Sequence, residues 1–331
     1  MTHPEALTSP LSVSDKPRPS LALALMALHR FEIGPLYFFV LVWGMFIAAD
    51  HPYDLWSTSA LLALFINGLS LFSGFVLNAY SDYPIDRRSS IKGHIADAVE
   101  RVGHRATLML YWVEQILTVA AATVISVLLQ NWSFVFVKLL GIVAGILYNG
   151  EPFRLKGRGI WNPIMLAVRL GFVPGWIAYL AVHHGVIGAG GWTVLGGMTS
   201  ISFSRGIWNS ISDTAEDRAE GIQTPAVLYG ARFAMRMAVT ILLPSCALMW
   251  LGLWIIAGPV PALIGASGIC GATIYRFMLL KQASDDHAAI ALLSGPIRRI
   301  DGRWAIGTYL AVVVAGAVHM INLAFGPEGA L

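Results

Sequence analysis

Residues 59–80 read SALLALFINGLSLFSGFVLNAY, a run that contains no charged side chain. A helix needs about 20 mostly apolar residues to cross the hydrocarbon core of a bilayer, so this run predicts a membrane-spanning helix. The rest of the 331-residue chain has the same character, with 56% hydrophobic and 12% charged residues. A soluble chain carries about 25% charged residues. The composition therefore predicts an all-α polytopic membrane protein and excludes a disordered chain, a coiled coil and an ordinary cytosolic enzyme.

Eight further apolar runs bring the number of predicted spans to nine. The nine runs cover residues 33–50, 59–80, 106–129, 132–148, 162–182, 190–209, 233–257, 259–280 and 304–325. Residues 1–20 are rich in proline and serine and predict a disordered cytosolic tail. Residues 21–331 are expected to form a single domain of nine transmembrane helices. Within that domain, residues 21–28 are apolar but too few to cross the bilayer, and we expect them to lie along its interface.

The basic residues fall almost entirely on one side of the predicted spans. All of the 22 lysines and arginines except Lys138 and Arg169 lie in the tail, in alternate loops or within four residues of the span ends that border those loops, and the opposite loops, for example near Asn131 and His184, contain none. Positively charged loops stay in the cytoplasm. We therefore expect a multi-pass protein of a bacterial inner or plasma membrane, with its N terminus in the cytosol and its C terminus outside. The small net charge of +3 gives no sign of a nucleic-acid partner.

Two segments at the cytosolic ends of even-numbered spans share a polar pattern. They read Asn78-Ala-Tyr-Ser-Asp82-Tyr-Pro-Ile-Asp86 and Asn209-Ser-Ile-Ser-Asp213-Thr-Ala-Glu-Asp217. The two segments begin 131 residues apart, which indicates an internal repeat. Residues four apart share one face of a helix, so each segment places one asparagine and two aspartates on the same face. Pro84 predicts a kink or a break within the first segment.

Two carboxylates on one helical face repel each other and require a compensating charge. Mg²⁺ binds a few carboxylate oxygens together with phosphate oxygens of a substrate. We therefore interpret the aspartates of both segments as ligands of Mg²⁺ ions that hold a diphosphate between them. These ligands are Asp82, Asp86, Asp213 and Asp217. The alternative is that the carboxylates are solvated and balanced by nearby arginines, but the coincidence of spacing, membrane side and span end in both halves favours the metal site.

A third cytoplasmic segment follows the fourth span and reads Tyr148-Asn-Gly-Glu-Pro-Phe-Arg154-Leu-Lys156-Gly-Arg158-Gly. Positive-inside anchoring alone explains three cations in such a loop. Beside two acidic segments, however, the same cations favour a phosphate clamp. In that interpretation Lys156 acts as a point charge and Arg154 as a bidentate fork.

These three segments resemble the motifs of UbiA-type intramembrane prenyltransferases. The first segment matches the family's NxxxDxxxD motif, and the second, followed by Gly221-Ile222-Gln223-Thr224, matches its second aspartate-rich motif. Residues 148–159 are similar to the family's YSxxPxRxKxxG segment. The resemblance covers nearly all of the chain after the tail. One departure is the stretch Arg88-Ser-Ser-Ile-Lys92, where many members have Asn-Lys-Pro-x-Arg-Pro.

The resemblance implies a ring of nine helices around a central cavity, closed by a cytosolic cap that carries both aspartate motifs. Mg²⁺ would bridge these motifs to an isoprenyl diphosphate whose tail lies in the cavity. The residues expected to act in catalysis are Asp82, Asp86, Asp213, Asp217, Lys156 and Tyr148, with the four aspartates binding the metal. The residues expected to bind substrate are Asn78, Arg154, Asn209 and Arg88.

The predicted reaction is Mg²⁺-dependent transfer of an isoprenyl chain from its diphosphate to an aromatic or other lipophilic acceptor, through an allylic carbocation. The metal and the basic clamp lower the charge on the departing oxygens, and the cavity keeps water from the cation. A membrane terpene cyclase of the same superfamily would carry the same motifs and stays an alternative. A transporter with internal repeats is the rival from another class, although its binding groups would lie near the midplane. The acceptor, the chain length and the group that takes up the proton stay open.

Three charged side chains lie well inside the predicted spans, away from the span ends. Glu114, Lys138 and Arg169 lie at similar depths of about 11–15 Å from the cytosolic side, at a rise of about 1.5 Å per residue. Charged groups in a membrane interior are costly and are usually paired. We therefore predict a buried cluster in which Glu114 pairs with Lys138 or Arg169. Arg30 and Glu32, at the start of the first span, are further candidates for contact with the acceptor.

Overall fold

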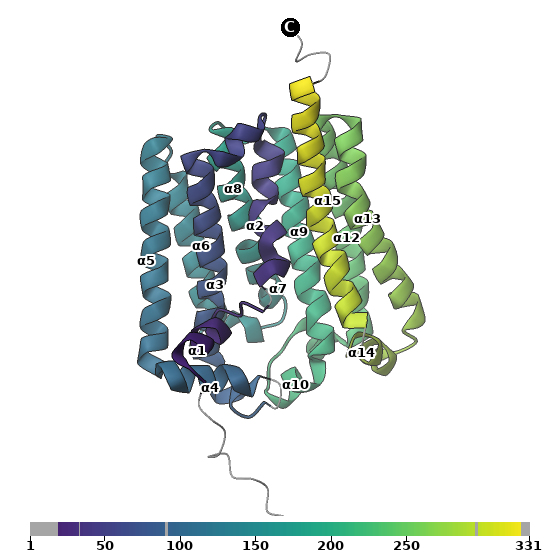
Figure 1. The fold of residues 1–331 in the computed structure, drawn as a ribbon. Helices are drawn as coiled ribbons and strands as arrows, with labels where there is room; N and C mark the ends of the chain where they lie inside the picture. The colour runs from purple at the N-terminus through teal and green to yellow at the C-terminus, as the bar shows by residue number, and fades with distance from the viewer. Residues whose placement is uncertain (1–18, 33, 90–91, 295–296, 326–331) are drawn as a thin grey trace, which may run out of the picture.

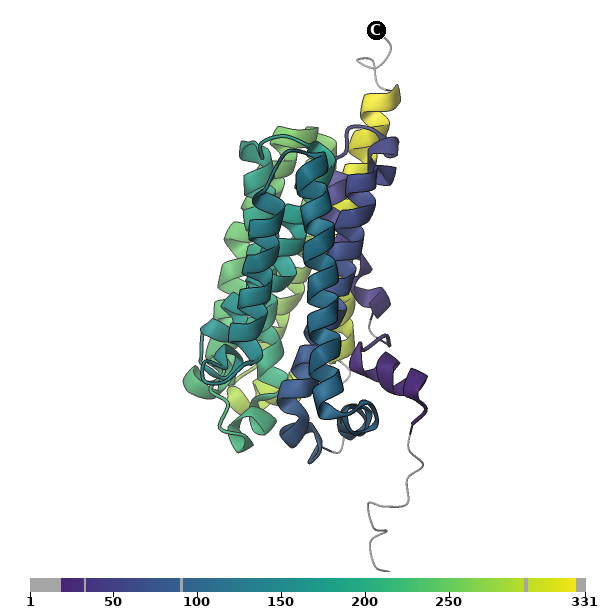
Figure 2. The same ribbon diagram turned by 90° about the vertical axis from the view of Figure 1, so that its left-hand side faces the viewer.

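A computed structural model describes residues 19–32, 34–89, 92–294 and 297–325. Its long helices run roughly parallel to one another and form a bundle, seen from two sides in Figure 1 and Figure 2. Within these ranges the chain forms helices and turns, and the sheet-type pairing found there is one isolated bridge between Arg158 and Gln223. The predicted all-α class is therefore confirmed.

The described α-helices fall into a longer and a shorter group. The long ones are α2 (Gly34–Ala48), α3 (Thr58–Asp86), α5 (His104–Leu128), α6 (Ser133–Asn149), α9 (Ala189–Ser212), α12 (Ala231–Ala257), α13 (Pro259–Gln282) and α15 (Ile297–Phe325). The shorter ones are α1 (Leu21–Leu28), α4 (Gly93–Val102), α7 (Trp161–Ala167), α8 (Val173–His183), α10 (Thr214–Ala219), α11 (Pro225–Tyr229) and α14 (Asp286–Ser294). One π-helical turn, Val168–Phe172, joins α7 to α8.

Six helices in the described part of the chain are long and apolar enough to cross a membrane. They are Thr58–Asp86, His104–Leu128, Trp161–His183, Ala231–Ala257, Pro259–Gln282 and Gly302–Phe325. Two shorter apolar helices cover Tyr37–Ala48 and Ser133–Asn149. The structure therefore describes an integral membrane protein with six helices of spanning length, where the sequence predicted nine spans.

Helix α3 contains the whole apolar run of residues 59–80. The hydroxyl of Ser57 accepts a hydrogen bond from the backbone N–H of Ala60 at 3.2 Å and caps its N terminus. The helix continues through Pro84 and ends at Asp86, so the predicted break within the first aspartate motif does not occur. Asn78, Asp82 and Asp86 consequently stay on one helical face.

Four short helices, α1, α4, α10 and α14, lie at one end of the bundle and form the cap, while α15 ends at the opposite end (Figure 1). Helix α4 runs across the ends of the long helices and buries Ile95, Ala98 and Val99 on one face. The side chain of Ser20 caps α1 by accepting a hydrogen bond from Leu23 N at 3.3 Å. Of the predicted disordered tail, residues 1–18 lie outside the described residues.

The predicted pairing of Glu114 with Lys138 or Arg169 is wrong. Glu114 is buried, and its Oε1 lies 2.7 Å from Nε2 of His29, which follows α1. Lys138 instead donates hydrogen bonds to Ser70 Oγ at 2.7 Å and to Gln115 Oε1 at 2.8 Å. Counting residues along a span gives the depth of a side chain in the membrane but not its direction around the helix axis. That direction decides which groups can meet.

Candidate functional site

The two aspartate motifs line the same cavity, although they lie in opposite halves of the chain. Asp82 and Asp86 come from the end of α3, whereas Asp213 and Asp217 come from the end of α9 and from α10. The cavity has a volume of about 310 Å³ and is named here the acidic cavity. The four aspartates therefore line one space.

The first motif is neutralised by the basic loop that follows α6. Asp82 Oδ1 accepts hydrogen bonds from Lys156 Nζ at 2.5 Å and from Arg154 Nη2 at 3.1 Å. Lys156 is buried, and its ammonium also donates to Asn149 Oδ1 at 3.3 Å and to Asn78 Oδ1 at 3.5 Å. Burial lowers the pKa of Lys156, and the charge of Asp82 opposes that shift only in part. Both cations of the predicted phosphate clamp thus converge on the first motif.

The second motif has a different backbone from the first. Helix α9 ends at Ser212, Asp213 caps it, and Asp217 belongs to the separate short helix α10. The hydroxyl of Thr224 donates a hydrogen bond to Asp217 Oδ2 at 3.1 Å. Burial and the neighbouring carboxylate of Asp213 nevertheless raise the pKa of Asp217 to about 7. The expected single helical face holds for the first motif, whereas the second motif is divided between two helices.

Two contacts tie the halves of the cavity together. Gln223 N donates to Gly157 O at 3.0 Å, and Gly159 N donates in return to Gln223 O, so the loop that carries Lys156 is paired with the chain just after α10. Gly159 has a φ of +56°, a conformation that glycine adopts without strain. On the other side, Lys92 Nζ lies 4.0 Å from Glu216 Oε2. These contacts join the segments that flank the two aspartate motifs.

The donor set fits a divalent metal that also binds phosphate. Among the described residues, no group of three or more His, Cys, Asp or Glu side chains lies close enough to hold a metal ion without other ligands. Mg²⁺ does not require such a group, because one or two carboxylates plus substrate phosphates complete its coordination. Asp86 is 3% exposed, and its Oδ2 has no hydrogen-bond partner within the described structure. A cation in the acidic cavity would satisfy this atom and offset the repulsion at Asp217.

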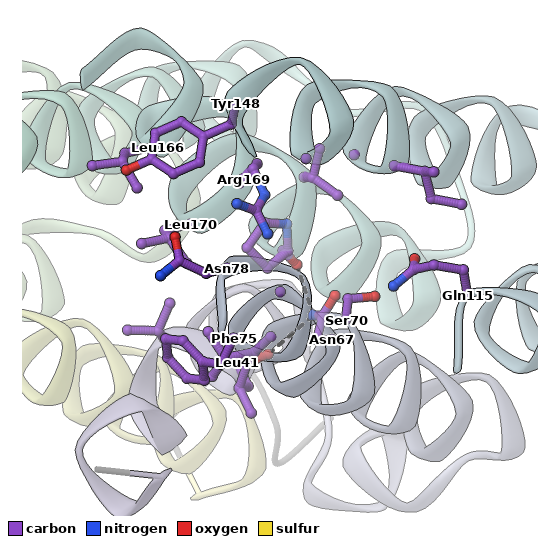
Figure 3. Close-up of a pocket in the computed structure, with 18 of the residues that line it drawn as sticks. Leu41, Asn67, Ser70, Phe75, Asn78, Gln115, Tyr148, Leu166, Arg169 and Leu170 are labelled. Carbon is purple, nitrogen blue, oxygen red and sulfur yellow. Dashed lines mark hydrogen bonds between the residues drawn. The ribbon is translucent and has the colours of Figure 1, made fainter. Parts of the chain in front are cut away.

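A second cavity of about 200 Å³, named here the inner cavity, adjoins the first (Figure 3). Arg30, Asn78, Tyr148 and Leu166 line both cavities. The apolar part of its wall includes side chains from α2, from α3 and from the continuous helical segment Trp161–His183, among them Leu41, Phe75, Leu170 and Val173. A molecule with a charged head in the acidic cavity could therefore place an apolar part between the helices.

The structure distributes the other predicted residues unequally. Asn209, Asn78 and Tyr148 line the acidic cavity. Arg88 is exposed, donates to Pro84 O at 3.2 Å, and is not part of the described cavity lining. Glu32 is likewise exposed and lines neither cavity.

Several lining residues were given no role from the sequence, and three of them make polar contacts near the motifs or lie beside them. Lys92 and Thr224 lie in the acidic cavity, as does Asn162, whose Nδ2 donates to Lys156 O at 2.8 Å. Lys92 and Thr224 stand within the motif-flanking stretches, so their neighbours in the sequence offered a signal. Asn162 begins an apolar run and offered none.

Comparisons with known proteins agree with this architecture. The sequence profile of the UbiA prenyltransferase family matches residues 37–300. The chain therefore belongs to the UbiA prenyltransferase family, a family of membrane prenyltransferases.

One curated relative and several solved structures resemble the chain. The bacteriochlorophyll synthase 33 kDa chain of Rhodobacter capsulatus is 29% identical over 147 residues, which cover 43% of this chain and 48% of that protein, so the match spans about half the length of the relative. A UbiA homolog from Archaeoglobus fulgidus, bound to GPP and Mg²⁺, has a TM-score of 0.68 at 17% identity, covering 90% of this chain and 99% of the homolog. A UbiA homolog from Aeropyrum pernix K1 has a TM-score of 0.62 at 15% identity, covering 91% and 98%. These structures have the same fold.

Proposed function

We propose that this protein is a Mg²⁺-dependent intramembrane prenyltransferase, which moves an isoprenyl chain from its diphosphate to an aromatic or other lipophilic acceptor. The observation that carries the proposal is the position of both aspartate motifs around one cavity, which shares four lining residues with a mostly apolar cavity deeper in the bundle. Family membership supports it. The homolog bound to GPP and Mg²⁺ and the bacteriochlorophyll synthase relative support, in turn, the diphosphate with its metal and a lipophilic acceptor.

The acidic and the basic residues of the acidic cavity have different proposed roles. The four aspartates would hold Mg²⁺, which offsets the charge of the carboxylates and of the diphosphate when it is bound. Arg154 and Lys156 bind the diphosphate oxygens, and in doing so they exchange their contact with Asp82 for one with substrate. Asn78 and Asn209 supply polar contacts beside them, and Lys92, which lines the cavity, takes the place proposed for the exposed Arg88.

The reaction begins with cleavage of the allylic C–O bond. The electron pair leaves with the diphosphate, where Lys156 and Arg154 stabilise the added charge and Tyr148 lies beside the leaving oxygen. The carbocation that remains is kept from water by the apolar wall of the inner cavity. The acceptor then donates an electron pair to the cationic carbon, and an acceptor that attacks through a C–H or O–H position releases its proton. Diphosphate and the prenylated acceptor are the products.

The membrane arrangement is also part of the proposal. Residues 21–331 form one domain with nine spans, in which α2, α6 and α9 cross the membrane together with the six helices of spanning length. The cap and its basic loops lie in the cytosol, where a soluble diphosphate head arrives. Phe325, at the other end of α15, lies on the outer side.

The experiment that tests the function is incubation of the purified protein with geranyl, farnesyl and geranylgeranyl diphosphates, Mg²⁺ and a panel of lipophilic acceptors. We expect diphosphate release that needs Mg²⁺ and falls at least about 100-fold in Asp82→Ala and Asp213→Ala. Asp97→Asn is the matched control, because this exposed carboxylate of α4 lies in the cap but lines neither cavity. Release that persists in EDTA, or in both alanine variants, contradicts the proposal.

Analysis of the organic product separates the two kinds of prenyl chemistry. A prenylated acceptor identifies transfer, whereas a cyclic hydrocarbon or alcohol formed without acceptor identifies a terpene cyclase. A transporter would release no diphosphate under any of these conditions.

A further inference from the structure

Asn162 lies at the start of α7 and lines the acidic cavity, yet it has no role in the reaction proposed above. Its side-chain Nδ2 donates a hydrogen bond to the backbone carbonyl of Lys156 at 2.8 Å. This bond fixes the orientation of the side-chain amide, because Oδ1 in the place of Nδ2 would face another acceptor. Asn162 therefore holds the main chain from which the side chain of Lys156 extends.

The other end of the same amide is unsatisfied. Oδ1 of Asn162 is buried and has no hydrogen-bond partner within the described structure. A buried acceptor without a donor lowers stability, so a leucine of similar shape would relieve that loss while it gives up the bond to Lys156. The two effects oppose each other, and stability alone does not account for an asparagine here. Local features that lower stability are expected where a residue serves function.

The turn that contains Lys156 needs contacts to hold its conformation. Lys156 lies in the 3₁₀ turn Leu155–Gly157, and Arg154, which precedes this turn, has a φ of +36°. A residue other than glycine in this left-handed region is strained and keeps its conformation only where the surroundings hold it. The hydrogen bond from Asn162 is one of those contacts, and it comes from a residue outside the turn.

Asn162 is itself fixed by the packing of α7 against α9. Its neighbour Pro163 is buried, and a Cβ atom on Gly206 of α9 would lie 2.9 Å from both Cα and Cβ of that proline. Helix α9 ends at Ser212, directly before Asp213 of the second aspartate motif. Asn162 thus connects the turn of the phosphate clamp to the helix that leads into the other half of the acidic cavity.

The contact with Asn162 has its largest effect when the diphosphate is bound. In the free protein, Asp82 Oδ1 holds the ammonium of Lys156 at 2.5 Å. The proposed binding of the diphosphate replaces this contact, so the tip of the lysine is then no longer tied to α3. A lysine side chain has many rotamers, and movement of its backbone would add to the entropy that it loses on binding. The bond between Asn162 and the Lys156 carbonyl does not involve the ammonium and stays in place.

We propose that Asn162 is a positioning residue for Lys156, which fixes the backbone of the turn Leu155–Gly157 so that the ammonium is already in place when the diphosphate arrives. The inference rests on the proposed prenyltransferase function. Preorganised donors need no rearrangement at the moment of binding. Because Asn162 acts through Lys156, its effect on diphosphate binding should vanish when the side chain of Lys156 is removed.

Calorimetric binding of inorganic pyrophosphate with Mg²⁺ to the purified full-length protein tests the proposal. We expect the affinity to fall about fivefold in Asn162→Leu and in Asn162→Ala, since both lose the hydrogen bond to Lys156. In a Lys156→Met background, Asn162→Leu should lower the affinity by less than about twofold more, because the group that it positions is absent. The thermal unfolding midpoint of Asn162→Leu should stay within about two degrees of the wild type.

Hydrogen exchange of the ligand-free protein reports on the turn directly. The amides of Gly157 and Arg158 donate hydrogen bonds to Arg154 O and Leu155 O within the turn. In Asn162→Leu these amides should exchange about fivefold faster than in the wild type, because the turn opens more often without its outer contact.

Gln223→Ala is the matched control. This exposed residue pairs with Gly157 and Gly159 through its backbone, which alanine keeps, so the substitution changes a side chain beside the same turn without removing a contact of the turn. Its affinity for pyrophosphate should stay within about twofold of the wild type. Its amide exchange in the turn should be unchanged.

Each of the following results overturns the proposal. The first is wild-type affinity, or unchanged amide exchange, in the Asn162 variants. The second is the full loss of affinity from Asn162→Leu in the Lys156→Met background, since Asn162 would then act independently of the lysine. The third is an equal loss in Gln223→Ala. The fourth is failure of both Asn162→Leu and Asn162→Ala to fold, which would make Asn162 a structural residue.

The wild type separates this outcome from that of the enzyme. If pyrophosphate does not bind to the wild type with Mg²⁺, the proposed function fails, and the role of Asn162 fails with it. If pyrophosphate binds to the wild type and equally well to the Asn162 variants, the positioning role fails and the prenyltransferase proposal stands.

Discussion

The pairing of His29 with Glu114 joins the cap to the membrane part of the bundle through one buried contact. Nδ1 of His29 lies 2.7 Å from Leu25 O, and its Nε2 lies 2.7 Å from Glu114 Oε1. Burial lowers the pKa of His29, but the hydrogen bonds to Glu114 and Leu25 and the charge of Glu114 together outweigh burial, so its pKa is raised above 6.5. The folded protein therefore binds a proton at His29 more tightly than the unfolded chain does.

This raised pKa predicts a pH dependence of stability. The stabilisation by protonated His29 is fully present below the unfolded pKa of about 6.5 and is lost as the pH rises through the higher folded pKa. The thermal unfolding midpoint should therefore fall by a few degrees as the pH rises above about 6.5, and His29→Gln should remove that part of the dependence. His51→Gln, an exposed histidine at the opposite end of the bundle, is the control. An unchanged pH profile in His29→Gln would contradict the prediction.

Lys156 provides a second test at the scale of one residue. In Lys156→Met the diphosphate loses a buried positive charge, so we expect affinity for inorganic pyrophosphate with Mg²⁺ to fall about tenfold or more, measured by calorimetry. Arg158→Met removes a cation from the same loop, but this arginine is exposed and donates to Pro152 O at 2.5 Å. Its affinity should stay within about twofold of the wild type. Equal losses in both variants would mean that the charge of the loop, and not the position of Lys156, binds the phosphate.

At the scale of the element, the sequence predicts long helices well and short ones poorly. The apolar run at residues 59–80 lies entirely within α3, because its composition demands burial in lipid wherever it is placed. Helix α4 has an apolar and a charged face, and it gains its stability by packing Ile95 and Val99 against the ends of other helices. The local sequence of α4 does not indicate against which helices it packs. The same reason explains why the split of the second motif between α9 and α10 was missed.

Helices α2 and α8 pack closely where Gly175 meets Trp43, and this contact gives a prediction about stability. A Cβ atom on Gly175 would overlap the ring of Trp43, which is 1% exposed, so the two helices can approach only with glycine at this position. Gly175→Ala should lower the free energy of unfolding by about 1–3 kcal/mol. Gly196→Ala in α9 is the matched control, because a Cβ atom there meets nothing within 4 Å and alanine favours a helix by up to about 1 kcal/mol. Denaturant titration of both variants gives the comparison, and equal effects would contradict it.

At the scale of the whole molecule, the repeated motifs showed that two distant segments belong together but not how they meet. The equal spacing of the aspartates indicated a shared ligand. The contacts between Gln223 and Gly157 and between Lys92 and Glu216 join segments beside the two motifs that no pattern in the sequence connects. Likewise, the sequence identified Arg169 as an intramembrane charge. Its position against Gly74 and Gly145 depends on how three helices pack together, which the sequence does not show. The sequence therefore indicated which residues belong to the candidate site, but it did not indicate which residues they contact.

The orientation of the molecule gives the last prediction. Basic loops gather on the cap side, so the cap should face the cytosol, and an odd number of spans should place Phe325 outside. In a Cys246→Ala, Cys270→Ala background, Phe325→Cys and Val186→Cys, which are 86% and 88% exposed in the wild type, should react with a membrane-impermeant maleimide in intact cells. Asp97→Cys in the cap should react only after permeabilisation. Labelling of residues 97 and 325 from the same side would mean an even number of spans between them, where the nine-span arrangement requires an odd number.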